Sequence, residues 1–445
     1  MFHLSWQVDG WIVVAGALCG IAAALLGNFL VLRRMSLLGD AISHAVLPGL
    51  AAAFLLTGER QGWLIFAGAA LVGILTVLLI ELAKEFGRVD EGAAIGVVFT
   101  FLFALGLVMI VRAADRVDLD PGCVLYGAIE TTLVDLVDLG GWMVPRAVIS
   151  LAVMTVINLL FVVLLYRPLK VSTFDPQLAQ SQGIPVRAMH YALASLVAMT
   201  SVAAFESVGN ILVVAMFVVP PVTAWLCTDR LWLMIVLSAV FAVLSAVLGH
   251  VSAIALPALF GLPSTNTAGM MAVAAGALLV TAALFATRKG LLSRAVQSWQ
   301  VQRRILGEDL LGILYRNQAM AAGNLSPAIM SPVILRSKLI ASRWRTWFAL
   351  RRLRRRGWVS VSDSQVSLTA SGLAMAQNVV RSHRLWEQYL SAEAGLPEGL
   401  LHEGAERLEH FTDRELRERL NAETHAPTTD PHGKRIPPEA VSGNG

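Results

Sequence analysis

The sequence predicts two kinds of structure in one chain: an all-α polytopic membrane domain and, after it, a soluble domain. Residues 1–287 contain repeated apolar runs of up to 24 residues, enough for a helix to cross the hydrocarbon core of a bilayer. They carry 12 Lys and Arg against 16 Asp and Glu, whereas residues 288–445 carry 23 against 15 and hold no such run. We therefore expect a transmembrane domain over residues 1–290 and a soluble region beyond it.

Eight or nine transmembrane helices are expected, because two of the nine apolar segments are close to the minimum length. Lys and Arg concentrate in cytoplasmic loops, and the basic loops here alternate so that the N-terminus lies outside the cell and the C-terminus inside. Two broken apolar stretches, 119–141 and 251–263, indicate interfacial or re-entrant segments. The candidate spans are 10–32, 37–56, 63–82, 92–111, 143–166, 191–205, 208–226, 231–248 and 269–286.

A carboxylate and an imidazole, Asp40 and His44, lie four residues apart inside the second apolar segment. Ionisable groups at membrane depth are costly, and they are expected to be functional. At this spacing both side chains project from one helix face, where together they could hold a divalent cation. The alternative is a pair at a helix end that reaches the membrane interface.

The polar segment 174–185, FDPQLAQSQGIP, separates two later spans. Its pattern predicts a short helix that is closed by a glycine, which would be a natural contact for a partner that moves the spans. An ordinary solvated linker is the alternative. The residues that we single out in this segment are Phe174, Asp175, Pro176, Gly183, Ile184 and Pro185.

Three motifs occur in one order: DAISHAVLPG at 40–49, FDPQLAQSQGIPV at 174–186, and VGNILVVA at 208–215 running into VPPVTA at 219–224. Together they resemble the permease subunits of bacterial ABC transporters that import zinc, manganese or iron(II) across the cytoplasmic (inner) membrane. The resemblance implies that Asp40 and His44 contact the metal in its pathway or gate. It also implies that 174–185 is a coupling helix seated on an ATPase.

The same resemblance implies three partners: a cytoplasmic ABC ATPase subunit, an extracytoplasmic metal-binding protein, and a second permease copy or paralogue. No Walker A sequence GxxxxGK[ST] occurs in the chain. We therefore expect a transport subunit that is not itself an enzyme, with ATP hydrolysed by another polypeptide.

The first part of the soluble region, 291–370, has the pattern of a winged-helix domain. A helical periodicity over 301–318 is followed by a basic helix over 337–356 and by an alternating hairpin at 359–368. Nine Lys and Arg without one acid lie between 336 and 356. This helix could enter a DNA groove, bind anionic lipid or simply be solvated. Its candidate contact residues are Arg343, Arg345, Arg351 and Arg352.

The next segment, 371–424, is expected to form two facing helices that bind metal. His383 and Glu387 are four residues apart, and a second helix follows a Gly-Leu-Pro turn. Imidazole and carboxylate groups at such spacings suit Mn, Fe or Zn, but they do not specify which metal. A charged, solvated helix face is the alternative. On the second helix His402, Glu406, Glu409 and His410 share one face.

The combination LTASG, VVRSHRLWEQYL and HEGAERLEH resembles metal-dependent repressors of the diphtheria toxin repressor type, which are winged-helix dimers. The second acid of the manganese-sensing members is Gly312 here, and the basic helix is unusually rich in arginine. We predict that residues 425–445, which are rich in proline, form a disordered tail. The resemblance places ligands at Asp309, His383, Glu387, His402, Glu406, Glu409 and His410.

The leading hypothesis is a permease for a divalent metal with a fused cytoplasmic domain that binds the same metal and throttles uptake. One alternative is a membrane-tethered, metal-responsive DNA-binding regulator. Another is a proton-coupled secondary transporter, although such a transporter has no need of a coupling helix.

Overall fold

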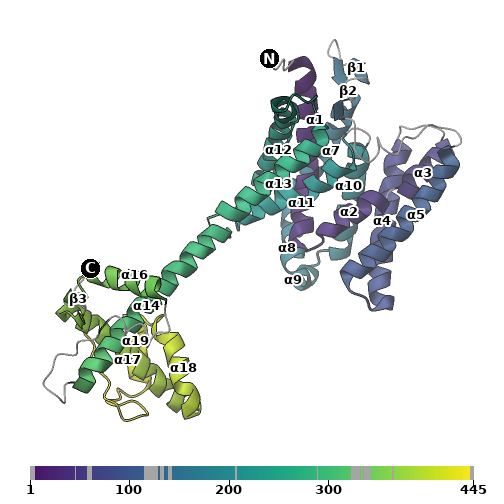
Figure 1. The fold of residues 1–445 in the computed structure, drawn as a ribbon. Coiled ribbons are helices and arrows are strands. Elements are labelled where there is room, and N and C mark those ends of the chain that lie inside the picture. Colours follow the sequence, from purple (N-terminus) through teal and green to yellow (C-terminus); the bar gives the residue numbers. More distant parts are fainter. Residues whose placement is uncertain are drawn as a thin grey trace. The chain divides into compact units, whose positions relative to one another are not determined.

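The computed structural model describes residues 6–45, 47–57, 63–114, 129–130, 135–138, 143–205, 208–287, 289–321, 331, 334, 342–362 and 365–440. The chain forms two compact units, Met1–Arg294 and Ala295–Gly445. Figure 1 traces it from the N-terminal helices in purple to the C-terminal unit in green and yellow. The predicted composition, mostly helices with little strand, is confirmed in both units.

The first unit is a bundle of apolar helices. Among the described residues, seven helical segments are long and apolar enough to cross a membrane, so the expected total of eight or nine is not confirmed. The predicted second span corresponds to α2 (Ser36–Ala45) and α3 (Leu47–Thr57), and α4 (Trp63–Gly87) follows. The seven segments are Asp9–Leu32, Gly92–Met109, Arg146–Leu164, Val186–Phe205, Asn210–Cys227, Leu231–Leu259 and Thr267–Phe285.

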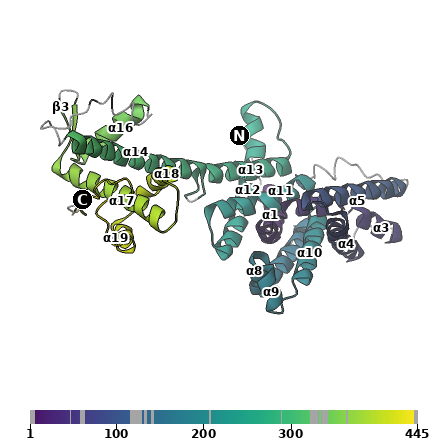
Figure 2. The same ribbon diagram turned by 90° about the horizontal axis from the view of Figure 1, so that it is seen from below.

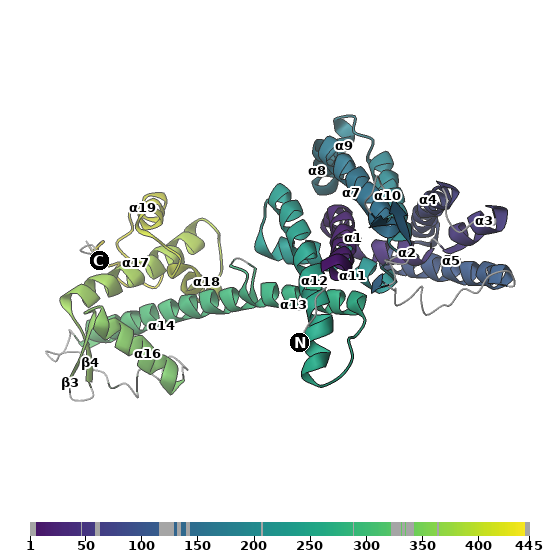
Figure 3. The same cartoon turned by 90° about the horizontal axis from the view of Figure 1, so that it is seen from above.

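Helix α1 (Trp6–Leu32) is the centre of this bundle. It packs against α7 (Arg146–Leu164), α11 (Asn210–Cys227) and α12 (Leu231–Leu259), as Figure 3 shows. A glycine permits one of these contacts. A Cβ added at Gly27 would lie 2.0 Å from the carbonyl oxygen of Phe217 on α11. Small residues therefore let the helix backbones approach closely, as is common in membrane bundles.

One of the two broken stretches, 251–263, was expected to be a separate interfacial or re-entrant segment, but its first part belongs to a long helix. Residues 251–259 continue α12 as one helix of 29 residues, and Pro257 lies inside it. Proline lacks the N–H that would bond the carbonyl of residue 253. The amide of Thr265 takes this place, at 3.1 Å from the Ala253 oxygen. The helix therefore tolerates the proline because the chain folds back and satisfies the released carbonyl.

The other broken stretch, 119–141, lies largely outside the described residues. What is described includes β1 (Leu136–Asp138), which pairs antiparallel with β2 (Met143–Pro145). The remaining helices of this unit are α5 (Glu91–Ala114), α8 (Tyr166–Phe174), α9 (Pro176–Ser181), α10 (Val186–Phe205) and α13 (Thr267–Phe285).

The second unit begins with the predicted order of helix, basic helix and hairpin. Its elements are α14 (Leu291–Ala321), α16 (Arg343–Arg355), β3 (Val359–Ser362) and β4 (Gln365–Leu368). They share one apolar core, and Figure 2 shows α14 and α16 beside each other. The order fits a winged helix, and assignment to that class stays a prediction. Buried core residues are Leu310, Leu311, Leu314, Ala349, Leu353, Val359, Val366 and Ala376.

Three helices complete this unit: α17 (Ala370–Ala392), α18 (Glu398–Glu409) and α19 (Arg414–Glu423). Helix α17 packs against both of the others. The α17–α18 connection contains Gly395 at φ +60°, a left-handed conformation that suits glycine. The two facing helices predicted from the sequence are therefore present and in contact, and their binding of metal stays a prediction.

The prediction of a disordered tail from residue 425 is wrong for residues 425–440. Arg381 donates to the Pro437 carbonyl at 2.7 Å, Arg417 pairs with Glu439 at 2.8 Å, and Asn378 and Ala440 exchange two hydrogen bonds. Arg384 also donates to the carbonyl of Arg435. The prolines end regular structure, but the polar groups of α17 and α19 bind the segment and keep it in place.

The close approach at Gly27 gives a first test. We expect Gly27→Ala to destabilise the bundle by about 2 kcal/mol, because the new methyl group must push α1 away from α11. Thermal unfolding of the purified protein in detergent measures this loss. Gly276→Ala is the matched control, since nothing lies within 4 Å of an added Cβ there. Equal melting temperatures for the two variants would contradict the packing described.

Candidate metal sites

The first candidate site lies in the membrane unit, where α2 meets α5 and α11. His44 Nε2 lies 3.4 Å from Asp40 Oδ1 and 2.8 Å from Asn210 Nδ2. The rings of Phe99 and Phe103 on α5 stand 5.5 and 5.7 Å from the imidazole. Neither predicted side chain is fully enclosed, because 47% of Asp40 and 22% of His44 are exposed. A carboxylate, an imidazole and an amide therefore converge beside an aromatic wall.

Asn210 was not singled out in the sequence, although it lies in the quoted VGNILVVA motif. It is the first residue of α11 and follows Gly209, which has φ +83°. Its side chain is buried, and its Oδ1 has no hydrogen-bond partner among the described residues. A half-turn of the amide would present this oxygen to the His44 side. Oxygen and imidazole nitrogen ligands suit first-row divalent metals.

The predicted coupling segment forms the short helix α9. Asp175 caps it by accepting from the Leu178 amide at 2.9 Å, and Pro176 occupies its first turn. Gly183 closes it at φ +76°, and the next amide, Ile184, bonds to the Ala179 carbonyl at 2.9 Å. Phe174, just before the helix, is 60% exposed. Pro185 is also exposed, so the segment presents apolar side chains outward.

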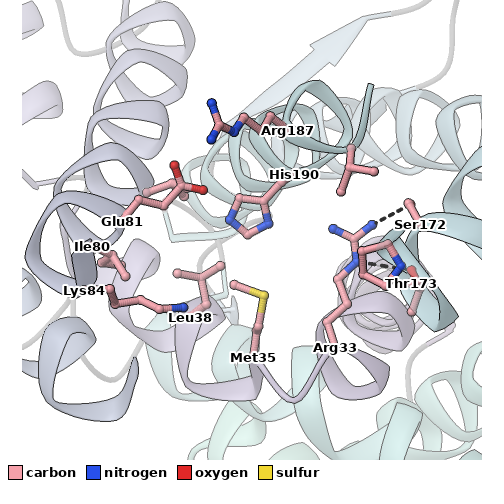
Figure 4. Close-up of a pocket in the computed structure, with 13 residues that line it drawn as sticks. Arg33, Met35, Leu38, Ile80, Glu81, Lys84, Ser172, Thr173, Arg187 and His190 are labelled. Carbon is pink, nitrogen blue, oxygen red and sulfur yellow. Dashed lines mark hydrogen bonds between the residues drawn. The ribbon is translucent and has the colours of Figure 1, made fainter. Parts of the chain in front are cut away.

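A pocket of about 310 Å³ lies between α4 and the elements around α9 (Figure 4). Arg33, at the end of α1, donates to Thr173 at 3.1 Å and to Ser172 at 3.0 Å on α8. Glu81 and His190 line the same pocket. Because the Arg33 guanidinium joins the end of α1 to α8, a movement of the α8–α9 segment would be transmitted to Arg33, three residues before α2 begins.

In the second unit, a first group of metal-ligand type forms between α17 and α18. Ligand atoms of His383, Glu387 and His402 all lie within 4.8 Å of one another. His383 Nε2 is 3.0 Å from Glu387 Oε1 and 2.9 Å from His402 Nδ1. His383 and Glu387 are buried, while His402 is exposed. The group is thus fixed on one side and open to water on the other.

A second group lies where α14 meets the end of α18. Asp309, Glu409 and His410 offer ligand atoms within 4.8 Å of one another. His410 Nε2 is 3.1 Å from Asp309 Oδ1 and 3.5 Å from Glu409 Oε1. Its other nitrogen, Nδ1, is 2.8 Å from Glu308 Oε2. A carboxylate behind a histidine in this way orients the ring and raises its basicity as a ligand.

Glu409 is a member of the second group and also contacts a histidine of the first. Its Oε2 lies 2.6 Å from His383 Nδ1, behind the ring that faces the first group, and its Oε1 faces His410 in the second. It is buried. One carboxylate therefore orients the histidine of one group and offers a ligand atom to the other, which links the two sites.

The buried histidines favour positive charge. Burial disfavours the charged imidazolium, but hydrogen bonds to Glu387 and Glu409 outweigh it and raise the pKa of His383 to about 9. Burial likewise opposes the charge of His410, and bonds to Asp309 and Glu308 raise its pKa to about 10. Burial would raise the pKa of Glu387, yet His383 lowers it to about 2. The same carboxylates would stabilise a divalent cation that replaced these protons.

The structure brings together six of the seven predicted regulatory ligands, namely all except Glu406. Buried positions on α18 recur at Leu401, Ala405 and Glu409, four residues apart. Glu406 lies about 100° around the helix from Ala405 and is exposed. Two residues near the groups were not predicted: Glu308, and His432, whose Nε2 lies 3.9 Å from Glu387.

The four predicted arginine contacts all lie on α16. Arg343, Arg345 and Arg351 are exposed, whereas Arg352 is half-buried. Burial and the neighbouring cation Arg356 lower the pKa of Arg352. The first three thus remain candidates for contact with a polyanion, and Arg352 partly faces the protein.

Comparison with known protein families gives one match in each of the two units. Residues 7–286 match the model of the ABC 3 transport family, and the chain belongs to this family. Residues 369–438 match the iron dependent repressor metal binding and dimerisation domain. The second range includes α17 to α19 and the ordered part of the tail. The predicted fusion of a permease with a repressor-type metal domain is confirmed.

Particular relatives support the same assignment. The chain is 40% identical over 304 residues to the manganese transport system membrane protein MntD of Bacillus subtilis, covering 67% of this chain and 99% of that protein. It is 34% identical to the zinc transport system membrane protein TroD of Treponema pallidum, covering 82% and 97%. A solved structure of PsaBC from Streptococcus pneumoniae in complex with Fab matches with a TM-score of 0.53 and 30% identity, over 63% of this chain and 92% of that one.

The raised histidine pKa values give a second test. Metal can bind an imidazole nitrogen only after its proton leaves, so metal affinity should rise with pH. We expect the apparent Kd of the purified protein for Mn(II) to fall by about tenfold per pH unit at each site between pH 6 and 8. Titration calorimetry at several pH values measures this change. Glu406→Gln should leave the pH profile unchanged, and a Kd independent of pH would contradict the arrangement.

Proposed function

We propose that this protein is the permease subunit of an ATP-driven importer of a divalent transition metal in the bacterial cytoplasmic membrane. The observation that carries the proposal is the convergence of Asp40, His44 and Asn210 in a bundle of the ABC 3 transport family. Relatives named for manganese and zinc transport support a metal cargo. Manganese, zinc and iron(II) all accept this mixture of oxygen and nitrogen ligands.

Transport needs contacts that form and break easily. An imidazole and a carboxylate that are partly exposed can exchange the waters of a passing ion, and a buried amide oxygen can add a third contact. The phenylalanines beside His44 exclude water from one side of the ring. We infer that Asp40, His44 and Asn210 form a transient binding site for the ion along its pathway.

The energy for transport comes from a separate ATPase subunit. The exposed apolar side chains around α9 fit a groove on such a partner, and Arg33 offers a mechanical connection from α8 to α1. A second permease copy or paralogue completes the pathway, and an extracytoplasmic metal-binding protein delivers the ion. The family assignment supports these three partners.

The second unit acts as a cytoplasmic metal sensor that reduces uptake when metal is abundant. Its two groups contain the ligand types that the transported ions prefer, and Glu409 of the second group contacts His383 of the first. A ligand shifts a conformational equilibrium only if it binds one state more tightly than the other. Feedback therefore requires that occupied and empty groups favour different arrangements of the permease.

A membrane-tethered DNA-binding regulator would not need Asp40, His44 and Asn210 to converge. The family match over 7–286 favours transport over this alternative. Feedback on transport does not require operator binding by α16.

Substitution of the membrane site tests the transport proposal. Asp40→Asn and His44→Ala should each reduce Mn(II) uptake roughly 10²-fold, since losing one ligand of a transient site costs a few kcal/mol. Uptake by cells that express the variant with its partner subunits measures the effect. Asp229→Asn, a carboxylate paired with Lys289, is the control and should transport normally. Uptake within twofold of wild type in both site variants would show that the pair is structural.

A further inference from the structure

Helix α16 has two different faces. Thr346, Ala349 and Leu353 are buried against the core of the second unit. On the opposite face Trp344 is 74% exposed, Trp347 49% and Phe348 40%. Large aromatic side chains seldom gather on a solvated helix face without a partner. The exposed face thus needs an explanation beyond the packing of the domain.

Arginines and aromatic rings alternate across this face and continue onto α14. The Arg303 guanidinium lies 4.4 Å from the Trp299 ring and 5.9 Å from the Phe348 ring. Phe348 and Trp347 meet edge to face at 4.9 Å, and Arg351 lies 5.1 Å from the Trp347 ring. We call these five residues together with Trp344 the aromatic–arginine strip.

We propose that the aromatic–arginine strip binds the anionic lipid surface of the membrane in which the first unit is embedded. Tryptophan and arginine have apolar bodies and polar tips, which suits them to the boundary between headgroups and acyl chains. Between 336 and 356 the chain has nine Lys and Arg and no acid, so its charge complements acidic headgroups. This inference goes beyond the proposed transport and sensing functions.

The chain itself keeps the strip near a bilayer. Helix α13, the last apolar helix, ends at Phe285, and α14 begins at Leu291. Trp299 therefore cannot lie more than roughly 50 Å from the end of that helix even if the chain between them were fully extended. A tethered surface meets lipid at a high effective concentration, so modest intrinsic affinity is enough for binding.

The exposed aromatic face favours lipid over duplex DNA as the occupant. Base edges in a major groove are read by hydrogen-bonding side chains such as Arg, Asn and Gln. In the first two turns of α16 two indoles, those of Trp344 and Trp347, are also exposed. A polar groove would leave much of their apolar surface in water, whereas a lipid interface buries it.

Hydrogen–deuterium exchange of the full-length protein in nanodiscs tests the proposal. We expect amides of 343–356 to exchange at least ~3-fold more slowly in discs with one-third phosphatidylglycerol than in discs of phosphatidylcholine alone. Salt at 0.5 M should weaken this protection, because it screens exposed charges. Equal exchange in the two kinds of disc would overturn the proposal. Protection that appears only when duplex DNA is added would also overturn it, in favour of nucleic-acid binding.

Two double variants separate the aromatic and ionic contributions. Trp344→Ser with Trp347→Ser, and Arg351→Glu with Arg354→Glu, change only exposed side chains and should each abolish the protection. Arg414→Glu with Arg419→Glu makes the same charge change on exposed residues of α19 and should leave it intact. Loss of protection in this control, or its survival in both strip variants, would contradict a lipid contact at the strip.

Discussion

The arrangement of the second unit depends on one buried carboxylate, Glu409, which lies between two histidines. Its oxygens reach His383 at 2.6 Å and His410 at 3.5 Å. A buried negative charge is tolerated only when it is compensated, here by a proton on each ring or by a metal ion near it. Since α14, α17 and α18 all contribute to this cluster, its charge state bears on how these helices pack.

The membrane unit accommodates its buried polar groups in a different way. Its central helix α1 is nearly all apolar and contains several glycines and alanines, so neighbouring backbones come close, and polar groups are placed where two or three helices meet. Asn28 bonds to Ser238 at 2.8 Å, and Asn158 bonds to Thr200 at 2.9 Å. The ionisable pair Asp40 and His44 lies on helix α2, which packs against both α1 and α11. Its partial exposure fits contact with an ion that must pass.

Local patterns in the sequence were sufficient for much of this account. Apolar runs predict the long helices, and the four-residue spacing of His383 and Glu387 predicts their contact, because both depend only on helix geometry. The glycine at 183 similarly predicts the end of α9, and the structure adds a cap at Asp175. In each case the deciding interactions lie within one turn or one element.

Features that depend on distant residues could not be predicted in this way. The support of Ala253 by Thr265, the binding of the tail by Arg381, and the approach of Asn210 to His44 all join separate segments. Glu406 has the expected spacing from His402, but the burial of Ala405 and Glu409 turns it outward. Tertiary packing thus decided which of the correctly spaced residues entered the site.

The most direct test of a permease restrained by its own metal sensor is Mn(II) uptake in cells already replete with manganese. Glu409→Gln keeps the size of the side chain and removes the charge that both histidines share, so uptake should continue when wild-type uptake stops. Glu406→Gln makes the same change at an exposed position one turn earlier, and uptake by this variant should stop as it does in wild type. If Glu409→Gln were shut down as fully as wild type while Mn(II) binding by the purified variant was lost, the sensor would be uncoupled from transport and the account would be wrong.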